Sequence, residues 1–289
     1  MGDLIVRPLN PAVGSEVLGF DPKRPLDDDV VAELRAAFDD RGVLVFRDLD
    51  IDEDRQRTLV YTLIREEPPA PGAQAEKRPM LVSNKEDKGA APYGRLLFHC
   101  DNMWARSPQP AISLYGVHVE PPGAPTQFVS MVHAWDTLPE ELRRRVEGLE
   151  ARHGFDTKYP NRGGDDDVID SYFEEPRWSV RPVAFRHPRT GRTMLYVSQQ
   201  ATIEILGLPA DENESLLAEL FAHLYRPSVV LDHDWREGDL VVWDNVAVQH
   251  GRGMVDLAGP VRTLRKVTGP LNLDPDELIL PVYSKVEGG

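Results

Sequence analysis

Hydrophobic and polar positions divide the chain into an N-terminal part that predicts helices and a longer part that predicts strands. Residues 4–6 begin a short strand, and residues 43–46 form a second apolar run. Between them, residues 25–40 carry apolar side chains at helical spacing behind three aspartates, which favour a helix N-terminus. Residues 52–64 show partial helical spacing and predict a second helix.

From residue 111 onward, β-branched and aromatic residues dominate. Two helices interrupt them, at 137–149 and 211–224, each beginning with a polar residue three positions before a glutamate, as in a capping box. Residues 187–191 predict a hairpin turn. This order favours a mainly β fold with flanking helices, built as a β-sandwich or as a double-stranded β-helix (jelly roll). The segments that predict strands are 112–120, 126–135, 181–187, 193–199, 228–235, 239–245 and 262–269.

Two irregular segments break this pattern. Residues 66–94 contain several prolines and many charges but few apolar positions. A loop of that length in a compact chain is either disordered or functional, and the chemistry begins directly after it, so we predict a lid. Residues 156–176 form the second segment, in which the aspartates at 165–167 favour a solvated loop. We find no repeat or linker, so we expect one domain over residues 1–289.

Charge and cysteine content narrow the function. The 289 residues carry 33 Lys and Arg against 48 Asp and Glu, a formal net charge of −15. This excess disfavours general binding to nucleic acid or to an anionic membrane. The single cysteine, Cys100, excludes an internal disulfide and a zinc site built from cysteines. We see no secretory signal and no apolar run of about 20 residues, so we expect a cytoplasmic protein.

Histidine and carboxylate pairs at i, i+2 are the candidate chemistry, because on a strand such side chains share one face. Two places qualify, His99 with Asp101 and His118 with Glu120. The second pair precedes two prolines and favours a surface strand end. Two histidines and one carboxylate form the facial triad that holds non-haem Fe(II) and leaves three positions open. A metal-dependent hydrolase and a non-catalytic jelly-roll binding protein remain the alternatives at this point.

Ordered motifs run along nearly the whole chain, from residues 4–48 through FHCDNMW to WDNVAVQHGR and VRTLRKVT. This set resembles the taurine/2,4-dichlorophenoxyacetate dioxygenase family, which uses Fe(II) and 2-oxoglutarate. The resemblance implies that His99, Asp101 and His250 bind the metal. The segments that carry the resemblance between these ends are FHCDNMW, PTQFVSMVHAWDTLPEEL and FRHPRTGRTMLYVS.

The resemblance also implies a cosubstrate site. Arg262 matches the arginine that binds the far carboxylate of 2-oxoglutarate, and a guanidinium suits a planar carboxylate. Thr126 matches a threonine whose hydroxyl helps to hold the same group. The implied reaction consumes O2 and 2-oxoglutarate, releases succinate and CO2, and hydroxylates or otherwise oxidises an aliphatic C–H bond. Asp101 argues against halogenation, since related halogenases carry a small residue there.

The substrate is less sharply defined. The region after the second helix lacks the histidine that taurine-type members use, and Arg95 stands where they carry a polar amide, which argues against taurine. A small organic acid and a larger specialised metabolite remain alternatives. The candidate substrate-binding residues are Lys266, Arg95, Phe98 and Trp104. Family members often form dimers or tetramers, so a homo-oligomer is a further alternative.

Strand alternation places residues 262 and 266 on one face and residue 265 on the other. If Arg262 points into the barrel, Lys266 does too. Its ammonium then needs an anionic partner. That partner is either a substrate anion or a carboxylate at the barrel rim, and a β-bulge between 262 and 266 would reverse the facing.

Overall fold

The structure is a computed structural model, and it describes residues 4–70, 72, 80–86, 89–154, 171–172, 177–270 and 282–283. Both helices predicted near the N-terminus are present, as α1 (Asp28–Arg41) and α2 (Glu53–Ile64). Each begins at an aspartate whose side chain accepts a backbone N–H, Asp27 for α1 and Asp52 for α2. The helix α1 ends at Gly42, whose φ of 71° is a left-handed conformation that glycine adopts without strain.

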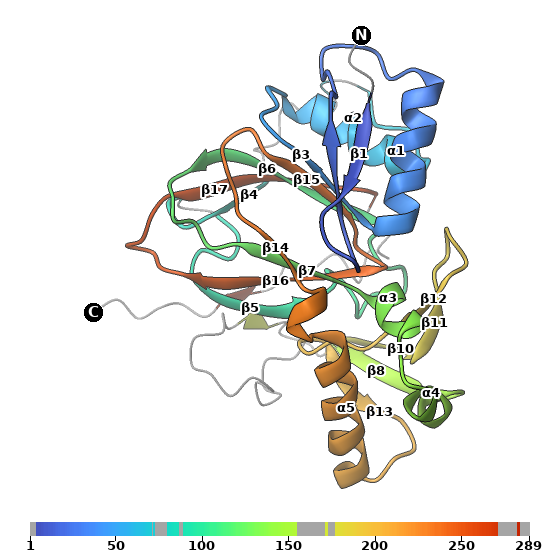
Figure 1. The fold of residues 1–289 in the computed structure, drawn as a ribbon. Coiled ribbons are helices and arrows are strands. Elements are labelled where there is room, and N and C mark those ends of the chain that lie inside the picture. The colour runs from blue at the N-terminus through green and yellow to red at the C-terminus, as the bar shows by residue number, and fades with distance from the viewer. Residues whose placement is uncertain are drawn as a thin grey trace.

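Two β-sheets face one another and form the centre of the molecule (Figure 1). The larger sheet has the order β1-β2-β3-β15-β6-β17-β4, and the smaller has the order β14-β7-β16-β5. The strands of the larger sheet are β1 (Ile5–Pro8), β2 (Ser15–Leu18), β3 (Val43–Phe46), β4 (Met80–Ser83), β6 (Ala111–Val119), β15 (Leu240–Asp244) and β17 (Arg262–Thr268). Those of the smaller sheet are β5 (Gly94–His99), β7 (Thr126–Ser130), β14 (Leu231–His233) and β16 (Val248–Val255).

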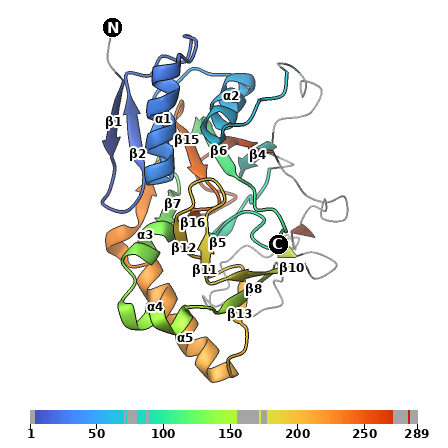
Figure 2. The same cartoon turned by 90° about the vertical axis from the view of Figure 1, so that its right-hand side faces the viewer.

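The central strands of the larger sheet are buried on both faces. In β3, Val43 and Val45 belong to the core between the sheets, whereas Leu44 and Phe46 pack with α1 and α2. Alternation along the strand produces this division, because successive side chains point to opposite faces. The two helices therefore cover the outer face of the larger sheet, as Figure 2 shows, and its inner face is left for the site.

A second group of elements lies at the end of the smaller sheet (Figure 1). It contains three helices, α3 (Met131–Asp136), α4 (Glu140–Val146) and α5 (Ala210–Leu224), with the short 3-10 helix η1 (Pro227–Val229) after them. Small sheets accompany them: β8 (Glu150–Gly154), β10 (Trp178–Pro182) and β13 (Thr202–Ile205); β11 (Ala184–Arg186) and β12 (Thr193–Leu195); and β9 (Ser171–Tyr172) and β18 (Val282–Tyr283).

Several predicted boundaries were wrong for local reasons. The strand expected over 126–135 ends at Ser130, whose side chain accepts the N–H of His133 and starts α3. The capping box predicted at Thr137 is absent, because that hydroxyl donates to the carbonyl of His133. The helices α4 and α5 instead follow Pro139 and Pro209, with no side-chain cap.

The irregular segment predicted over 66–94 is wrong in part. Residues 80–83 form β4, which pairs with β17 in the larger sheet, and residue 94 begins β5. Residues 71, 73–79, 87 and 88 of the predicted lid lie outside the described residues, as do 156–170 and 173–176 of the second irregular segment.

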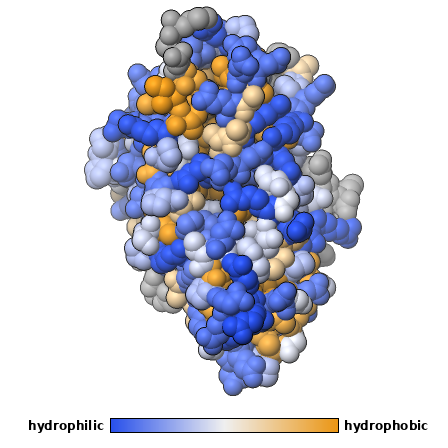
Figure 3. Space-filling model, turned by 45° about the vertical axis from the view of Figure 1, so that its right-hand side comes forward, coloured by the Kyte–Doolittle hydropathy of each residue, from blue (hydrophilic) through white to orange (hydrophobic). Residues whose placement is uncertain are grey.

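The outer surface agrees with the charge of the sequence. The face drawn in Figure 3 is mostly hydrophilic, with apolar residues in separate groups. Among the residues described, no helix is long and apolar enough to cross a membrane.

Candidate active site

Three side chains from neighbouring segments converge between the two sheets. His99 ends β5, Asp101 follows two residues later, and His250 lies in β16. The strands β5 and β16 are antiparallel, and their register sets His250 directly opposite His99. One ligand atom from each of the three residues lies within 4.8 Å of the other two. In the part of the chain that the structure describes, this is the single such group of metal-binding side chains.

The ring nitrogens are arranged for metal binding. His99 donates from Nδ1 to the carbonyl of Leu97 at 2.7 Å, which leaves the lone pair of Nε2 free. That Nε2 lies 3.3 Å from Oδ1 of Asp101, and Nε2 of His250 lies 3.7 Å from the same oxygen. Two imidazole nitrogens and one carboxylate oxygen therefore face one point, which is the donor set of a facial triad.

The charges of these groups also fit a cation. Burial alone would raise the pKa of Asp101, but the charge of Lys266 and the neighbouring His99 hold it well below its usual range. Burial, reinforced by His99, lowers the pKa of His250 well below its usual value. A carboxylate and a neutral imidazole are the protonation states that a metal ion requires of its ligands.

Asn245 fixes the main chain at Asp101. Its Oδ1 accepts the N–H of Asp101 at 3.0 Å, and its Nδ2 donates to the carbonyl of Asp101 at 2.9 Å. The same amide nitrogen donates to the carbonyl of Gln109 at 3.1 Å. Asn245 is fully buried, so these bonds form away from solvent.

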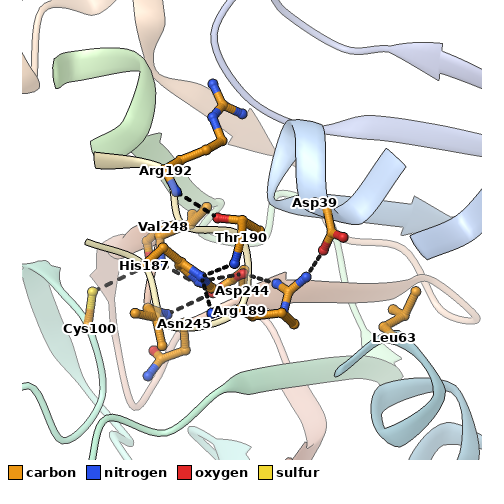
Figure 4. Close-up of polar contacts among 12 residues, drawn as sticks. Asp39, Leu63, Cys100, His187, Arg189, Thr190, Arg192, Asp244, Asn245 and Val248 are labelled. Carbon is orange, nitrogen blue, oxygen red and sulfur yellow. Dashed lines mark hydrogen bonds and ion pairs between the residues drawn. The ribbon is translucent and has the colours of Figure 1, made fainter. Parts of the chain in front are cut away.

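A buried ionic network holds the turn that carries Asn245 (Figure 4). Asp244 accepts from Nε2 of His187 at 3.1 Å and forms an ion pair with Arg189. Arg189 also pairs with Asp39 of α1, so one guanidinium joins two carboxylates. Burial would raise the pKa of Asp244, but the hydrogen bond from His187 and the charge of Arg189 lower it. Sequence reasoning missed Asn245 and Asp244, although both stand in the WDN motif.

Arg262 and Thr126 form the second part of the site. Nη2 of Arg262 donates to Oγ1 of Thr126 at 3.0 Å, and Nε donates to the carbonyl of Ala124 at 3.0 Å. These contacts join β17 of the larger sheet to β7 of the smaller one. Burial and the neighbouring Arg252 lower the pKa of Arg262 to about 9. Within the described residues, no carboxylate forms an ion pair with Arg262, so its buried charge is available to an anionic ligand.

The predicted facing of β17 is confirmed. Lys266 forms an ion pair with Oδ2 of Asp101 inside the site. Arg265 lies on the opposite face, where it donates to Gln56 of α2 at 2.8 Å and to the carbonyl of Ile51 at 2.9 Å. The register between β6 and β17 does shift, but the extra residue, Val117, lies in β6, so alternation along β17 is preserved.

The other three candidate substrate-binding residues, Phe98, Trp104 and Arg95, have different surroundings. The ring of Phe98 stacks on Tyr225 with centroids 4.7 Å apart, on the face of β5 opposite His99, which gives no support to its predicted contact with substrate. Trp104 is buried, and the guanidinium of Arg177 lies over its ring. Arg95 lies in β5, and a shift in the pairing of β5 with β16 separates it from His99.

The second histidine–carboxylate pair is a surface feature, as predicted. Nε2 of His118 lies 4.0 Å from Glu120 and 3.9 Å from Glu237, and these side chains are more than half exposed. No third metal-binding group of the described residues joins them.

Comparison with known proteins agrees with this geometry. The model of the taurine catabolism dioxygenase TauD, TfdA family matches residues 5–268. The chain is 29% identical to alpha-ketoglutarate-dependent 2,4-dichlorophenoxyacetate dioxygenase of Cupriavidus pinatubonensis, over 92% of this chain and 97% of that protein. It is also 29% identical to pentalenolactone F synthase of Streptomyces avermitilis, over 89% and 90%. A crystal structure of AAD-2 with Mn(II) and N-oxalylglycine superposes with a TM-score of 0.72, at 26% identity, over 92% of this chain and 96% of that one.

Proposed function

Because this chain belongs to the taurine catabolism dioxygenase TauD, TfdA family, we propose that His99, Asp101 and His250 hold the Fe(II) with which it oxidises a small organic substrate. Family membership makes the chain a 2-oxoglutarate-dependent dioxygenase that uses Fe(II), 2-oxoglutarate and O2. It also confirms the predicted jelly-roll core with flanking helices. The hydrolase and the non-catalytic binding protein, kept open on sequence grounds, are disfavoured by the same comparisons.

The proposal rests on one observation: the metal-binding triad and the pair Arg262 and Thr126 both lie in the space between the sheets. In the pairing of β7 with β16, Phe128 lies opposite His250 and Thr126 lies opposite Arg252. Thr126 is therefore two residues further along the sheet than the metal ligand, a separation on the order of 7 Å. A short dicarboxylate can span that distance, with one end at the metal ligands and the other at Arg262 and Thr126.

The residues then have separate tasks. Fe(II) and 2-oxoglutarate, held by these residues, would supply the oxidation: one oxygen atom of O2 would end in succinate as CO2 leaves, and the other would be inserted into a substrate C–H bond. Arg262 neutralises the far carboxylate of 2-oxoglutarate, and its rigid guanidinium fixes the direction of that group. Asp101 offers Oδ1 to the metal while Lys266 occupies Oδ2. The inward faces of the two sheets exclude bulk water from this space.

We propose that the substrate is a small organic acid whose anionic group lies near Lys266. The support is the inward position of its ammonium, beside the triad and on the face of β17 that carries Arg262. The relative from Cupriavidus pinatubonensis is named for a substrate with a carboxylate, 2,4-dichlorophenoxyacetate. The relative from Streptomyces avermitilis is named for a specialised metabolite, which keeps a larger product of that kind as the second candidate.

Two measurements test the activity. Succinate formation and O2 uptake, each measured with and without 2-oxoglutarate, should both depend on 2-oxoglutarate and on Fe(II). A mass-spectrometric screen of organic acids and specialised metabolites should then find a product that has gained one oxygen atom. Release of a hydrolysed product without O2 uptake would indicate a hydrolase, and ligand binding without turnover would indicate a binding protein.

We further propose that residues 1–289 act as one domain, which is supported by a family match that runs from residue 5 to residue 268. Light scattering on the purified chain measures whether this domain assembles into dimers or tetramers.

A further inference from the structure

Trp235 contacts both residues of the proposed cosubstrate site. Its indole Nε1 donates to Oγ1 of Thr126 at 2.9 Å. The guanidinium carbon of Arg262 lies 6.0 Å from the centroid of its ring, at the limit of a cation–π contact. The side chain is buried, with 5% of its surface exposed, and it follows β14 in the chain.

The hydroxyl of Thr126 can make one further hydrogen bond, as a donor. An indole N–H and a guanidinium N–H can only donate, so the bonds from Trp235 and Arg262 both end on Oγ1. A hydroxyl oxygen has two lone pairs and one hydrogen, and these two bonds use both lone pairs. The hydrogen remains for an acceptor, which a carboxylate oxygen supplies.

Trp235 is itself held by a tightly packed loop. This loop, residues 234–239, connects β14 to β15 and lies against Gly116 of β6. The N–H of Gly116 donates to the carbonyl of Asp239, and its carbonyl accepts from the N–H of Gly238, both at 2.9 Å. A Cβ added at Gly116 would lie 2.3 Å from the carbonyl oxygen of Arg236, so only glycine allows this approach. The indole therefore presents its N–H from a fixed position.

We propose that Trp235 is a positioning residue for 2-oxoglutarate. By occupying one lone pair of Thr126, it keeps the hydroxyl turned as a donor toward the far carboxylate, and its ring limits the movement of Arg262. The inference rests on the proposed function, because it takes Arg262 and Thr126 as the groups that hold the cosubstrate. It assigns Trp235 no contact with the metal or with the reacting atoms.

Four variants test this role. Trp235→Phe removes the N–H and keeps an aromatic ring, and Trp235→Leu also removes the N–H, with an aliphatic side chain in its place, should the first variant fold poorly. Thr126→Val removes the hydroxyl, and it is combined with Trp235→Phe. The matched control is Trp135→Phe, because Trp135 also lies under an arginine, Arg143 at 5.1 Å, but outside the site.

The measurement is the affinity of the Mn(II)-loaded protein for 2-oxoglutarate without O2, together with its affinity for Mn(II) alone. We expect Trp235→Phe to weaken 2-oxoglutarate binding roughly fivefold to tenfold, the usual effect of one lost hydrogen bond. Mn(II) affinity should stay at the wild-type value, and Trp135→Phe should change neither. In the Thr126→Val background, Trp235→Phe should cause no further loss.

Additive losses in the double variant, or a Trp235→Phe protein that binds 2-oxoglutarate as the wild type does, would overturn the inference. A parallel loss of Mn(II) affinity would also overturn it, because it would indicate a general disturbance of the site. The proposed function fails separately, if the wild-type protein itself does not bind 2-oxoglutarate or if Thr126→Val and Arg262→Leu leave that affinity unchanged.

Discussion

Asn245 binds both main-chain polar groups of Asp101, as a neighbouring strand would, although the two residues are 144 positions apart. Asp101 lies just beyond the end of β5, so this side chain replaces the missing strand partner. The position of the carboxylate therefore depends on one buried amide, which leads to the first prediction.

Asn245→Ala should weaken metal binding by roughly 10–100-fold, the range typical of residues that orient a metal ligand. Titration with Mn(II) measures this directly. Asn213→Ala is the control, because Asn213, in α5, is also buried and accepts the N–H of Ile205 at 2.7 Å. The control should lower stability and leave metal affinity unchanged. Equal metal affinity in the two variants would contradict the role of Asn245.

Asp101→Ala should abolish iron-dependent oxidation, because the metal loses its single anionic ligand and Lys266 loses its partner. Iron binding and 2-oxoglutarate-dependent O2 uptake measure the effect. Glu120→Ala, in the exposed pair with His118, should behave as the wild type. Wild-type turnover in Asp101→Ala, together with loss of turnover in Glu120→Ala, would indicate that the exposed pair of His118 and Glu120 is the metal site.

Arg262→Leu should raise the concentration of 2-oxoglutarate needed for half-maximal O2 uptake. Loss of a charge-assisted pair in a shielded site costs on the order of 2–5 kcal/mol, part of it from the carboxylate left unpaired. Arg265→Leu is the control from the same strand, since Arg265 binds Gln56 on the opposite face. An unchanged requirement in the first variant would exclude Arg262 from the cosubstrate site.

Lys266→Met should weaken substrate binding by tenfold or more, about 1.4 kcal/mol, with little change in 2-oxoglutarate affinity. Lys266→Arg keeps the charge and should retain much of the binding. Titration of each protein with the substrate found by mass spectrometry compares them. If both Lys266 variants bind that substrate as the wild type does, the ammonium serves Asp101 alone and the argument for an anionic substrate loses its main support.

Acid should destabilise the fold through His153. Burial, with a smaller effect of Arg181, lowers its pKa from 6.5 to about 3. The unfolded chain therefore takes up the proton first, so the stabilising effect is complete above pH 6.5 and is lost as the pH falls toward 3. The free energy of unfolding should fall by up to about 1.4 kcal/mol per pH unit in that range from this group.

Urea unfolding at pH 7 and pH 5 measures the dependence on pH. His153→Gln removes the titrating group and should reduce the slope, whereas His118→Gln, at an exposed position, should not. An unchanged slope in His153→Gln would show that other groups bind the protons.

Local signals made part of the fold predictable. The aspartates at 27–29 indicated the N-terminus of α1, and Asp27 caps it by accepting the N–H of Val30. The second helix was predicted from partial apolar spacing, and Asp52, with which the prediction began, is its cap. The strands β5 and β16 were not predicted, because residues such as His99 and His250 replace apolar side chains at positions that face the site. The chemistry of the site thus weakens the hydrophobic pattern that would reveal its strands.

The pair His99 and Asp101 was indicated by its spacing, whereas His250, Thr126 and Arg262 came from a resemblance. The structure adds residues that no local pattern indicates. Trp235 reaches Thr126 across 109 positions, and Asn245 reaches Asp101 across 144. Both contacts depend on the register between strands that are distant in the chain. Phe98 shows the reverse case, since it adjoins His99 in sequence but lies on the other face of β5.

Within the described residues, β5 and β14 are the two edge strands of the smaller sheet, and β5 carries His99 opposite His250. The side of β5 away from β16 has no strand partner among these residues, although the carbonyl of Phe98 accepts from the hydroxyl of Ser198 at 2.9 Å and from the N–H of Gln200 at 3.3 Å. An ion shared by His99 and His250 would join this strand to its neighbour. Metal loading should therefore hold β5 in the sheet and raise the free energy of unfolding, and chelating agents during purification would remove that stabilisation along with the activity.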